Sequence, residues 1–177
     1  MTLPEIELKP GKEQSVKRFH PWIFSGAIRK INGDVAEGDL VTVYSANGEF
    51  LGAGHYQKSS IAVRLLTFDE TPVDDSFWIS RIKRAIDYRK SLGFGLEPAS
   101  NVYRLIHGEG DLLPGLVIDR YNSTFVVQMH SAGMYLNREI IYSALKILFG
   151  ENCSAIYDKS EGTLPFKAGL SPENDYV

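Results

Sequence analysis

The stretch Leu40–Tyr56 reads LVTVYSANGEFLGAGHY, and it decides the fold of the first part of the chain. Its two halves are short runs rich in β-branched and aromatic residues, a composition typical of strands. Between them lies Asn47-Gly48, a strong hairpin signal because both residues tolerate the positive φ angles of a tight turn. The stretch therefore predicts a β-hairpin made of Leu40–Ala46 and Phe50–Tyr56.

Further strand signals lie on both sides of this hairpin. Downstream, Ile61–Phe68 (IAVRLLTF) is a third run of the same composition. Upstream, Pro21 holds His20 in an extended conformation, and four residues then share one face at period two: Trp22, Phe24, Gly26 and Ile28. We expect the two aromatic residues of this set to lie in the core. Short strands of this kind predict a small β-barrel over residues 1–70, followed by a polar linker over residues 71–75.

The hydrophobic period changes after the linker. Asp74 or Asp75 is expected to cap a helix that runs to about Leu92 and ends at Gly93. Four apolar residues define the buried stripe of this helix: Ile79, Ile82, Ala85 and Ile86. Arg89 is the exception, because helical spacing turns its cationic side chain toward the apolar side.

A second helix is predicted over Asn137–Phe149, where apolar residues follow the i, i+3, i+4, i+7 spacing and Gly150 ends the pattern. Strands are predicted at Tyr103–Ile106, Leu116–Arg120, Phe125–Met129 and Ala155–Asp158. These elements predict an α+β domain over residues 76–162, with two helices and a mainly antiparallel sheet. Residues 163–177 are loop-like until Tyr176-Val177, and we expect them to be a linker toward a C-terminal domain that this sequence lacks.

Composition favours a folded cytoplasmic protein. The 177 residues are 44% hydrophobic, which is enough for an ordinary core, and no apolar run approaches the ~20 residues that cross a bilayer. The single Cys153 excludes an internal disulfide and a multi-cysteine zinc site. The net charge is −3, yet residues 1–30 hold six Lys and Arg against three Asp and Glu, and residues 78–90 hold five against one. These two local basic segments are candidates for binding an anionic partner.

The glycine-rich stretch His107–Tyr121, HGEGDLLPGLVIDRY, is the first candidate site. His107 and Glu109 begin a zinc deaminase signature, but that chemistry needs a later Pro-Cys-x-x-Cys. Glu109 and Asp111 are a possible acid–base pair, although a solvated turn accounts for more of the residues. We interpret the stretch as a tight reversal between two strands, and we assign no catalytic, cofactor-binding or metal-binding residue in the chain. Cys153 is interpreted as a packed thiol.

The segment KPGKEQSVKRFHPWIFSGAIRK, residues 9–30, is the second candidate. Cations that contact phosphates, beside aromatic rings on which bases stack, are the general RNA-binding combination. The basic part of the first predicted helix extends the set. The residues predicted to bind RNA are Lys12, Lys17, Arg18, Arg29, Lys30, Arg81, Lys83 and Arg84.

Two stretches also carry a family resemblance. Residues 9–28, followed by GDLVTVYSANGEFLGAGHY and IAVRLLT, resemble the N-terminal PUA domain of RlmI-type S-adenosylmethionine-dependent rRNA large-subunit methyltransferases. The stretch from His107 resembles the central-domain motif of that family, G-E-x-D-G-L-P-G-L-x-V-D-R-Y, and IYDKSEG (residues 156–162) also fits. The motif is matched at Gly108, Glu109, Asp111, Leu113, Pro114, Gly115, Leu116, Asp119, Arg120 and Tyr121. Leu112 departs from it, because the family has glycine there.

The resemblance implies that this chain is the N-terminal part of a longer enzyme. That enzyme would bind S-adenosylmethionine in a C-terminal methyltransferase domain and, in the cytosine-modifying members, would use a cysteine there to attack C6 so that C5 takes the methyl group. The family lends this chain no catalytic residue, and its expected partners are ribosomal RNA and its own C-terminal domain. Two alternatives stay open: a complete, non-catalytic RNA-binding adaptor, and a small metal- or nucleotide-dependent hydrolase that uses His107, Glu109 and Asp111.

Overall fold

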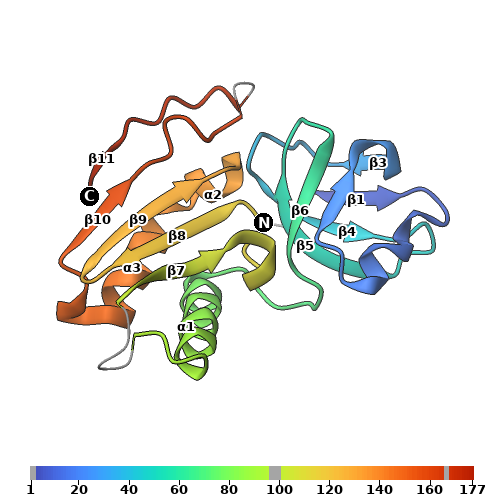
Figure 1. Cartoon of the computed structure of the whole chain (residues 1–177). Helices are drawn as coiled ribbons and strands as arrows, with labels where there is room; N and C mark the ends of the chain where they lie inside the picture. Colours follow the sequence, from blue (N-terminus) through green and yellow to red (C-terminus); the bar gives the residue numbers. More distant parts are fainter. Residues whose placement is uncertain (1–2, 96–100, 166–167) are drawn as a thin grey trace. The chain divides into compact units, whose positions relative to one another are not determined.

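The computed structural model describes residues 3–95, 101–165 and 168–177. The chain divides into two compact units, Met1–Thr71 and Pro72–Val177, which are drawn in Figure 1. Each unit has a sheet of its own, and each is described separately. The α+β class predicted from the sequence is confirmed.

The first unit is a curled, six-stranded sheet in the described residues, with strand order β2-β6-β5-β4-β1-β3. Adjacent strands are antiparallel except for β1 and β4, which run parallel. The sheet confirms the small barrel-like fold expected from the hairpin. Its strands are β1 (Glu5–Leu8), β2 (Trp22–Phe24), β3 (Ile28–Asn32), β4 (Leu40–Tyr44), β5 (Phe50–Tyr56) and β6 (Ile61–Thr67).

The predicted hairpin forms the centre of this sheet. Leu40 pairs with His55 and Thr42 with Ala53, so Val41 and Val43 both point into the core and are fully buried. Gly54 is needed where β5 meets β6, because a Cβ there would overlap the carbonyl oxygen of Arg64. The rest of the core comes from strands across the unit and includes Ile6, Leu8, Val16, Ile23, Leu51, Val63 and Leu65.

The prediction that alternate residues of Trp22–Ile28 share one buried face of a strand is wrong. The strand β2 ends at Phe24, a 3-10 turn follows at Ser25–Ala27, and β3 starts at Ile28, so no single strand carries the period-two face. Ile23 is the residue that points inward. Trp22 is therefore only half-buried, and Phe24 is 50% exposed, since successive side chains of a strand alternate between its faces.

The second unit is a five-stranded sheet in the described residues, with order β11-β10-β9-β8-β7. Only β9 and β10 are parallel, which confirms the mainly antiparallel sheet. The strands are β7 (Val102–His107), β8 (Leu116–Tyr121), β9 (Thr124–Met129), β10 (Ala155–Asp158) and β11 (Asp175–Tyr176). The last strand, β11, pairs with β10, in line with the strand-forming residues at positions 176–177.

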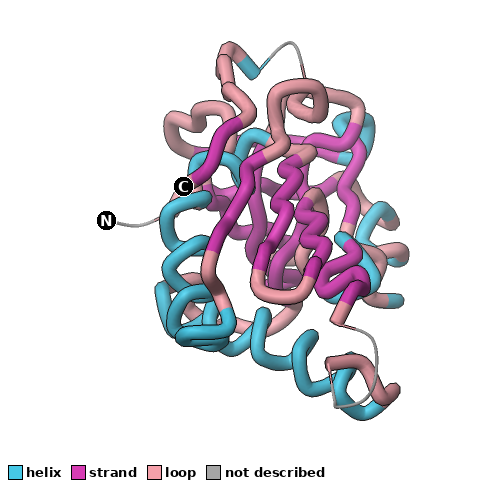
Figure 2. Tube along the Cα trace, turned by 60° about the vertical axis from the view of Figure 1, so that its left-hand side comes forward, coloured by secondary structure: helices cyan, strands magenta, loops and turns pink. Residues whose placement is uncertain are grey.

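Both predicted helices are present, as α1 (Asp75–Ser91) and α3 (Arg138–Phe149). They pack against each other on one face of the sheet, as Figures 1 and 2 show. Asp74 caps α1, because its carboxylate accepts a 3.0 Å hydrogen bond from the backbone N–H of Phe77. The pattern did not reveal the short helix α2 (Ala132–Leu136), which is capped by the Ser131 side chain and precedes α3 directly.

Candidate nucleic-acid interface

An exposed and strained phenylalanine marks the basic segment of the first unit. Phe19 caps a 3-10 turn (Val16–Arg18) in the left-handed conformation, with φ 62° and ψ 27°. A non-glycine residue pays about 1 kcal/mol or more for this conformation. Nevertheless the side chain is 71% exposed, and its ring meets Phe68 edge-on at a centroid distance of 5.3 Å. Strain kept at an exposed aromatic residue is a feature of functional sites.

More aromatic rings follow Phe19 along the chain. The rings of His20 and Trp22 meet edge-on at 5.8 Å, and those of Trp22 and Phe24 at 6.4 Å. The backbone N–H of Trp22 donates a 3.2 Å hydrogen bond to Nδ1 of His20, which orients the imidazole. The two aromatic residues of β2 also line a hollow of about 340 Å³ together with Lys12, Ser15, Val16, Ile23, Gly26 and Ala27. The segment thus offers ring surfaces of the kind on which bases stack.

The predicted phosphate contacts of this segment differ in their pairing. Lys12 and Arg18 are exposed, and among the described residues they have no ion-pair partner. Lys17 is also exposed, but its Nζ lies 2.6 Å from Glu49 Oε2, and this hydrogen bond raises the pKa of the lysine. Exposed pairs of this kind contribute little and yield to a stronger anion. Lys12 and Arg18 are therefore the cations best placed to meet a phosphate.

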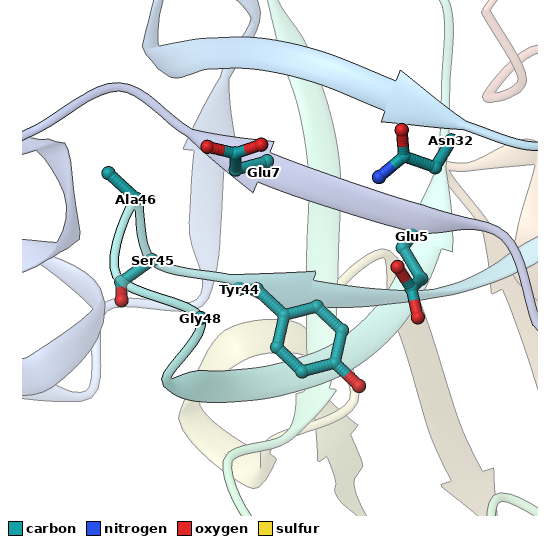
Figure 3. Close-up of a pocket in the computed structure, with 7 residues that line it drawn as sticks. All are labelled: Glu5, Glu7, Asn32, Tyr44, Ser45, Ala46 and Gly48. Atoms are coloured by element: carbon teal, nitrogen blue, oxygen red, sulfur yellow. The ribbon is translucent and has the colours of Figure 1, made fainter.

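Arg29 and Lys30 lie on β3, in acidic surroundings. Arg29 Nη1 is 2.7 Å from Glu7 Oε1, and Lys30 is the cross-strand neighbour of Glu7. On the same side of the sheet, a hollow of about 390 Å³ is lined by both carboxylates of β1, as Figure 3 shows. Its lining is Glu5, Glu7, Asn32, Tyr44, Ser45, Ala46 and Gly48. No cation lines this hollow, so it does not favour a phosphate.

The three predicted cations of α1 also differ. Lys83 forms an exposed i, i+4 pair with Asp87 at 2.5 Å, whereas the guanidinium of Arg81 lies 5.0 Å from the centroid of the Phe77 ring. Arg84 is exposed, and within the described ranges it has no ion-pair partner. Of these three predicted cations, Arg84 is therefore the most available.

The interpretation of His107–Tyr121 as a reversal is confirmed. Strand β7 ends at His107, a 3-10 turn covers Gly108–Asp111, and β8 returns antiparallel from Leu116. Leu112 adopts the left-handed conformation with φ 57° and ψ 32°. This conformation explains why the family motif has glycine at the position, since only glycine adopts it without steric cost.

Asp111 holds this turn to α1 through the arginine that the helical pattern could not place. Both carboxylate oxygens accept from Arg89, at 2.9 Å from Nη1 and 2.7 Å from Nη2, and Oδ2 also accepts from the backbone N–H of His107 at 2.6 Å. Arg89 Nε donates to the carbonyl oxygen of Arg104 at 2.9 Å. The acid is thus occupied by a structural ion pair, which argues against an acid–base role. In the described part of the chain, no group of three or more His, Cys, Asp or Glu could hold a metal ion.

Two further polar groups lie close to the sheet of the second unit. Burial raises the pKa of the Cys153 thiol, which disfavours the nucleophilic thiolate. Tyr142 donates a short hydrogen bond to the buried Asp158, in the IYDKSEG segment, and burial and that bond raise the pKa of the tyrosine. The hydrogen bond accounts for Tyr142 and Asp158 as parts of the fold, and the raised pKa argues against a nucleophilic role for Cys153.

Sequence reasoning found the basic segment but missed which aromatic residues are available at its surface. Phe19 and Phe24 are exposed, although Phe24 was expected in the core. The sequence signal for Phe19 was its position between Arg18 and His20. The residues around it do not alternate between apolar and polar in the way that would place Phe19 on the buried face of a strand. For Phe24 the signal was the apolar Ile23 beside it. Because Ile23 is buried, the neighbouring side chain of Phe24 points to the opposite face of the strand.

Comparison with known proteins first defines the class of the first unit. Residues 6–68 match the family model of the PUA-like domain, so this unit contains a PUA-like domain.

The relatives then extend the match to most of the chain. Ribosomal RNA large subunit methyltransferase I from Yersinia pseudotuberculosis and from Yersinia pestis are each 40% identical to it over 165 residues, which are 92% of this chain and 41% of theirs. The resemblance to RlmI-type methyltransferases is thereby confirmed, and this chain spans about two fifths of the length of these relatives.

Solved structures agree on the fold. A protein from Streptococcus mutans that is assigned to the SAM-dependent methyltransferases superposes with a TM-score of 0.76 at 19% identity, covering 98% of this chain and 42% of its own. A second protein assigned to the methyltransferases, crystallised with SAH, gives 0.74 at 20% identity, covering 96% of this chain and 43% of its own. At these identities the likeness shows a shared fold alone.

None of the helices in the described residues combines the length and the apolar character that a membrane-spanning helix needs.

Proposed function

We propose that this chain is the RNA-recognising part of a SAM-dependent rRNA methyltransferase of the cytoplasm, which methylates C5 of a cytosine. The observation that carries the proposal is the exposed, left-handed Phe19 next to the unpaired cation of Arg18 and close in sequence to Lys12. The PUA-like match of residues 6–68 and the identity to ribosomal RNA large subunit methyltransferase I support RNA as the ligand.

In this proposal the chain positions its substrate and does no bond-making. Lys12, Lys17 and Arg18 neutralise phosphates and release counterions, which gives affinity that falls with salt. Phe19 and Phe24 offer rings for unpaired bases. A base must leave its stack before a methyl group can reach C5, and holding the surrounding RNA reduces the entropic cost of that alignment.

The cofactor belongs to another part of the enzyme. S-adenosylmethionine supplies the methyl group when bound, and a nucleotide site of this kind requires a strand, a glycine-rich turn and a long helix in that order. In the described residues, α1 follows a polar, proline-containing segment, and the short helix α2 follows β9 through His130-Ser131, which is not a glycine-rich turn. These segments do not fit the cofactor, so the proposal places both it and the catalytic cysteine in a C-terminal methyltransferase domain.

Removing Lys12 and Arg18 tests the electrostatic part of the proposal. For Lys12→Ala/Arg18→Ala we expect binding of a structured rRNA fragment to weaken, and the slope of log affinity against log salt to become shallower by about two, since each lost phosphate contact removes about one unit. Fluorescence anisotropy over a salt series measures both. Arg29→Ala is the matched control with a smaller effect, because Glu7 already neutralises that cation. Salt-independent binding by the unaltered chain would contradict the proposal.

Phe19→Gly separates RNA binding from stability. Glycine adopts the left-handed conformation freely, so we expect the free energy of unfolding to stay within about 1 kcal/mol of the original. RNA affinity should fall about tenfold, because the loss of one base–ring stack costs about 1–3 kcal/mol. Thermal melting and anisotropy on the same sample measure the two effects. Unchanged affinity in a folded variant would remove Phe19 from the interface.

A further inference from the structure

The second unit has a groove of its own between the end of α1 and strand β7. It has a volume of about 550 Å³, within the size range of small-ligand sites, and we call it the α1–β7 groove. Its side chains are mainly aromatic and cationic. They include Tyr88, Phe94, Tyr103 and Arg104.

The rings of the groove are held in place and remain accessible. Tyr88 is 56% exposed on α1. Phe94 and Tyr103 lie against each other with a centroid distance of 5.4 Å and an interplanar angle of 35°. The hydroxyl of Tyr103 accepts a 3.1 Å hydrogen bond from Nη1 of Arg120, which fixes that ring. Exposed, oriented rings of this kind are stacking surfaces that accept any base.

The charges around the groove favour an anion. Arg104 lines it and has a half-exposed guanidinium. At the other end, an adjoining hollow of about 260 Å³ shares Tyr88 and Asp111 with the groove and is lined by Arg84, which has no ion-pair partner among the described residues. The two nearby acids are already engaged, Asp111 by Arg89 and Asp119 by Arg104. A ligand therefore meets the cation of Arg84, whereas these two carboxylates are compensated by arginines.

We propose that the α1–β7 groove binds a nucleotide of single-stranded RNA, with the base on Tyr88 or on the Phe94–Tyr103 pair and a flanking phosphate at Arg84. This inference rests on the proposed function, because it names a second RNA contact in the unit that the PUA-like match leaves out. An apolar protein segment would cover the aromatic rings of the groove, but it would offer no anion to the guanidinium groups beside them.

The experiment uses the whole chain and a fluorescein-labelled octamer of uridylate that contains one 4-thiouridine. We expect Tyr88→Ala and Phe94→Ala each to lower the octamer affinity about tenfold, and Arg84→Ala to flatten the salt dependence by about one unit. Photocrosslinks should map to the groove. Tyr176→Ala is the matched control, because it removes an exposed tyrosine of the same unit from β11, and it should leave octamer affinity unchanged.

The outcomes separate this inference from the proposed function. Loss of octamer binding in the groove variants, with folding intact by thermal melting, supports the groove even if Lys12→Ala/Arg18→Ala has no effect on structured rRNA. Crosslinks confined to the first unit, or octamer affinity unaffected by Tyr88→Ala and Phe94→Ala, overturn the groove and leave the proposed function standing. Absence of any octamer binding at low salt also overturns it, as expected if a protein segment occupies the groove.

Discussion

Arg89→Met is expected to lower the free energy of unfolding of the second unit by about 3–5 kcal/mol. The side chains of Arg89 and Asp111 are only 11% and 6% exposed, and the guanidinium makes two hydrogen bonds to the carboxylate and one to the carbonyl oxygen of Arg104. Methionine fills similar space but leaves a buried carboxylate without its counter-charge. That uncompensated charge is the main cost, since desolvation of an unpaired ion is far more expensive than loss of apolar contact.

Urea unfolding followed by tryptophan fluorescence measures this loss, because Trp78 on α1 is buried in the second unit and a Trp22→Phe background removes the other signal. Lys83→Met is the matched control: it breaks an exposed i, i+4 pair on the same helix and should cost no more than about 0.5 kcal/mol. Arg89→Met/Asp111→Leu should recover much of the loss by removing the stranded charge. An Arg89→Met effect as small as that of Lys83→Met would show that the pair does not hold the turn.

The same pair shows how far sequence reasoning reaches. Helical spacing placed the cation of Arg89 toward the apolar side of the first predicted helix. The turn-forming residues predicted the reversal at Gly108–Gly115. Nothing local joins the two observations, because Asp111 lies 22 residues further along the chain and only the folded sheet brings it under α1. Local patterns therefore predicted the elements and the unusual residues, whereas the contact that uses them is tertiary.

The sequence pattern also failed to predict which side chains of a short strand point into the core. Strand β2 is three residues long, and an alternating pattern that short is compatible with either face of the strand pointing inward. Large aromatic residues favour the core on average, which is why Trp22 and Phe24 were expected there. The buried position belongs to Ile23, and its two aromatic neighbours border the candidate RNA surface instead. The predicted function depends on such exceptions, since a binding surface keeps apolar rings where folding alone would bury them.

Acid is expected to destabilise the first unit through His55. This residue lies on β5, is fully buried, and has a pKa lowered from 6.5 to about 4, first because burial disfavours the charged imidazole and second because Arg64 repels it. Between these two values the unfolded chain binds a proton that the folded chain does not. The contribution of neutral His55 to the free energy of unfolding is therefore complete above about pH 6.5. It is lost as the pH falls toward 4, by about 3 kcal/mol in total.

The histidine contribution is isolated by comparing the unaltered chain with His55→Gln in urea titrations at about pH 7 and about pH 4.5. Carboxylates in ion pairs also lose stabilising charge in this window, but they do so equally in both proteins. We expect the unaltered first unit to lose about 2–3 kcal/mol more than the variant on acidification, with His20→Gln, which replaces an exposed histidine of the same unit, behaving like the unaltered chain. Equal acid losses in all three proteins would mean that His55 takes up its proton in the folded state near the ordinary pKa, and therefore that the interior around β5 admits water or a counter-charge when the pH falls.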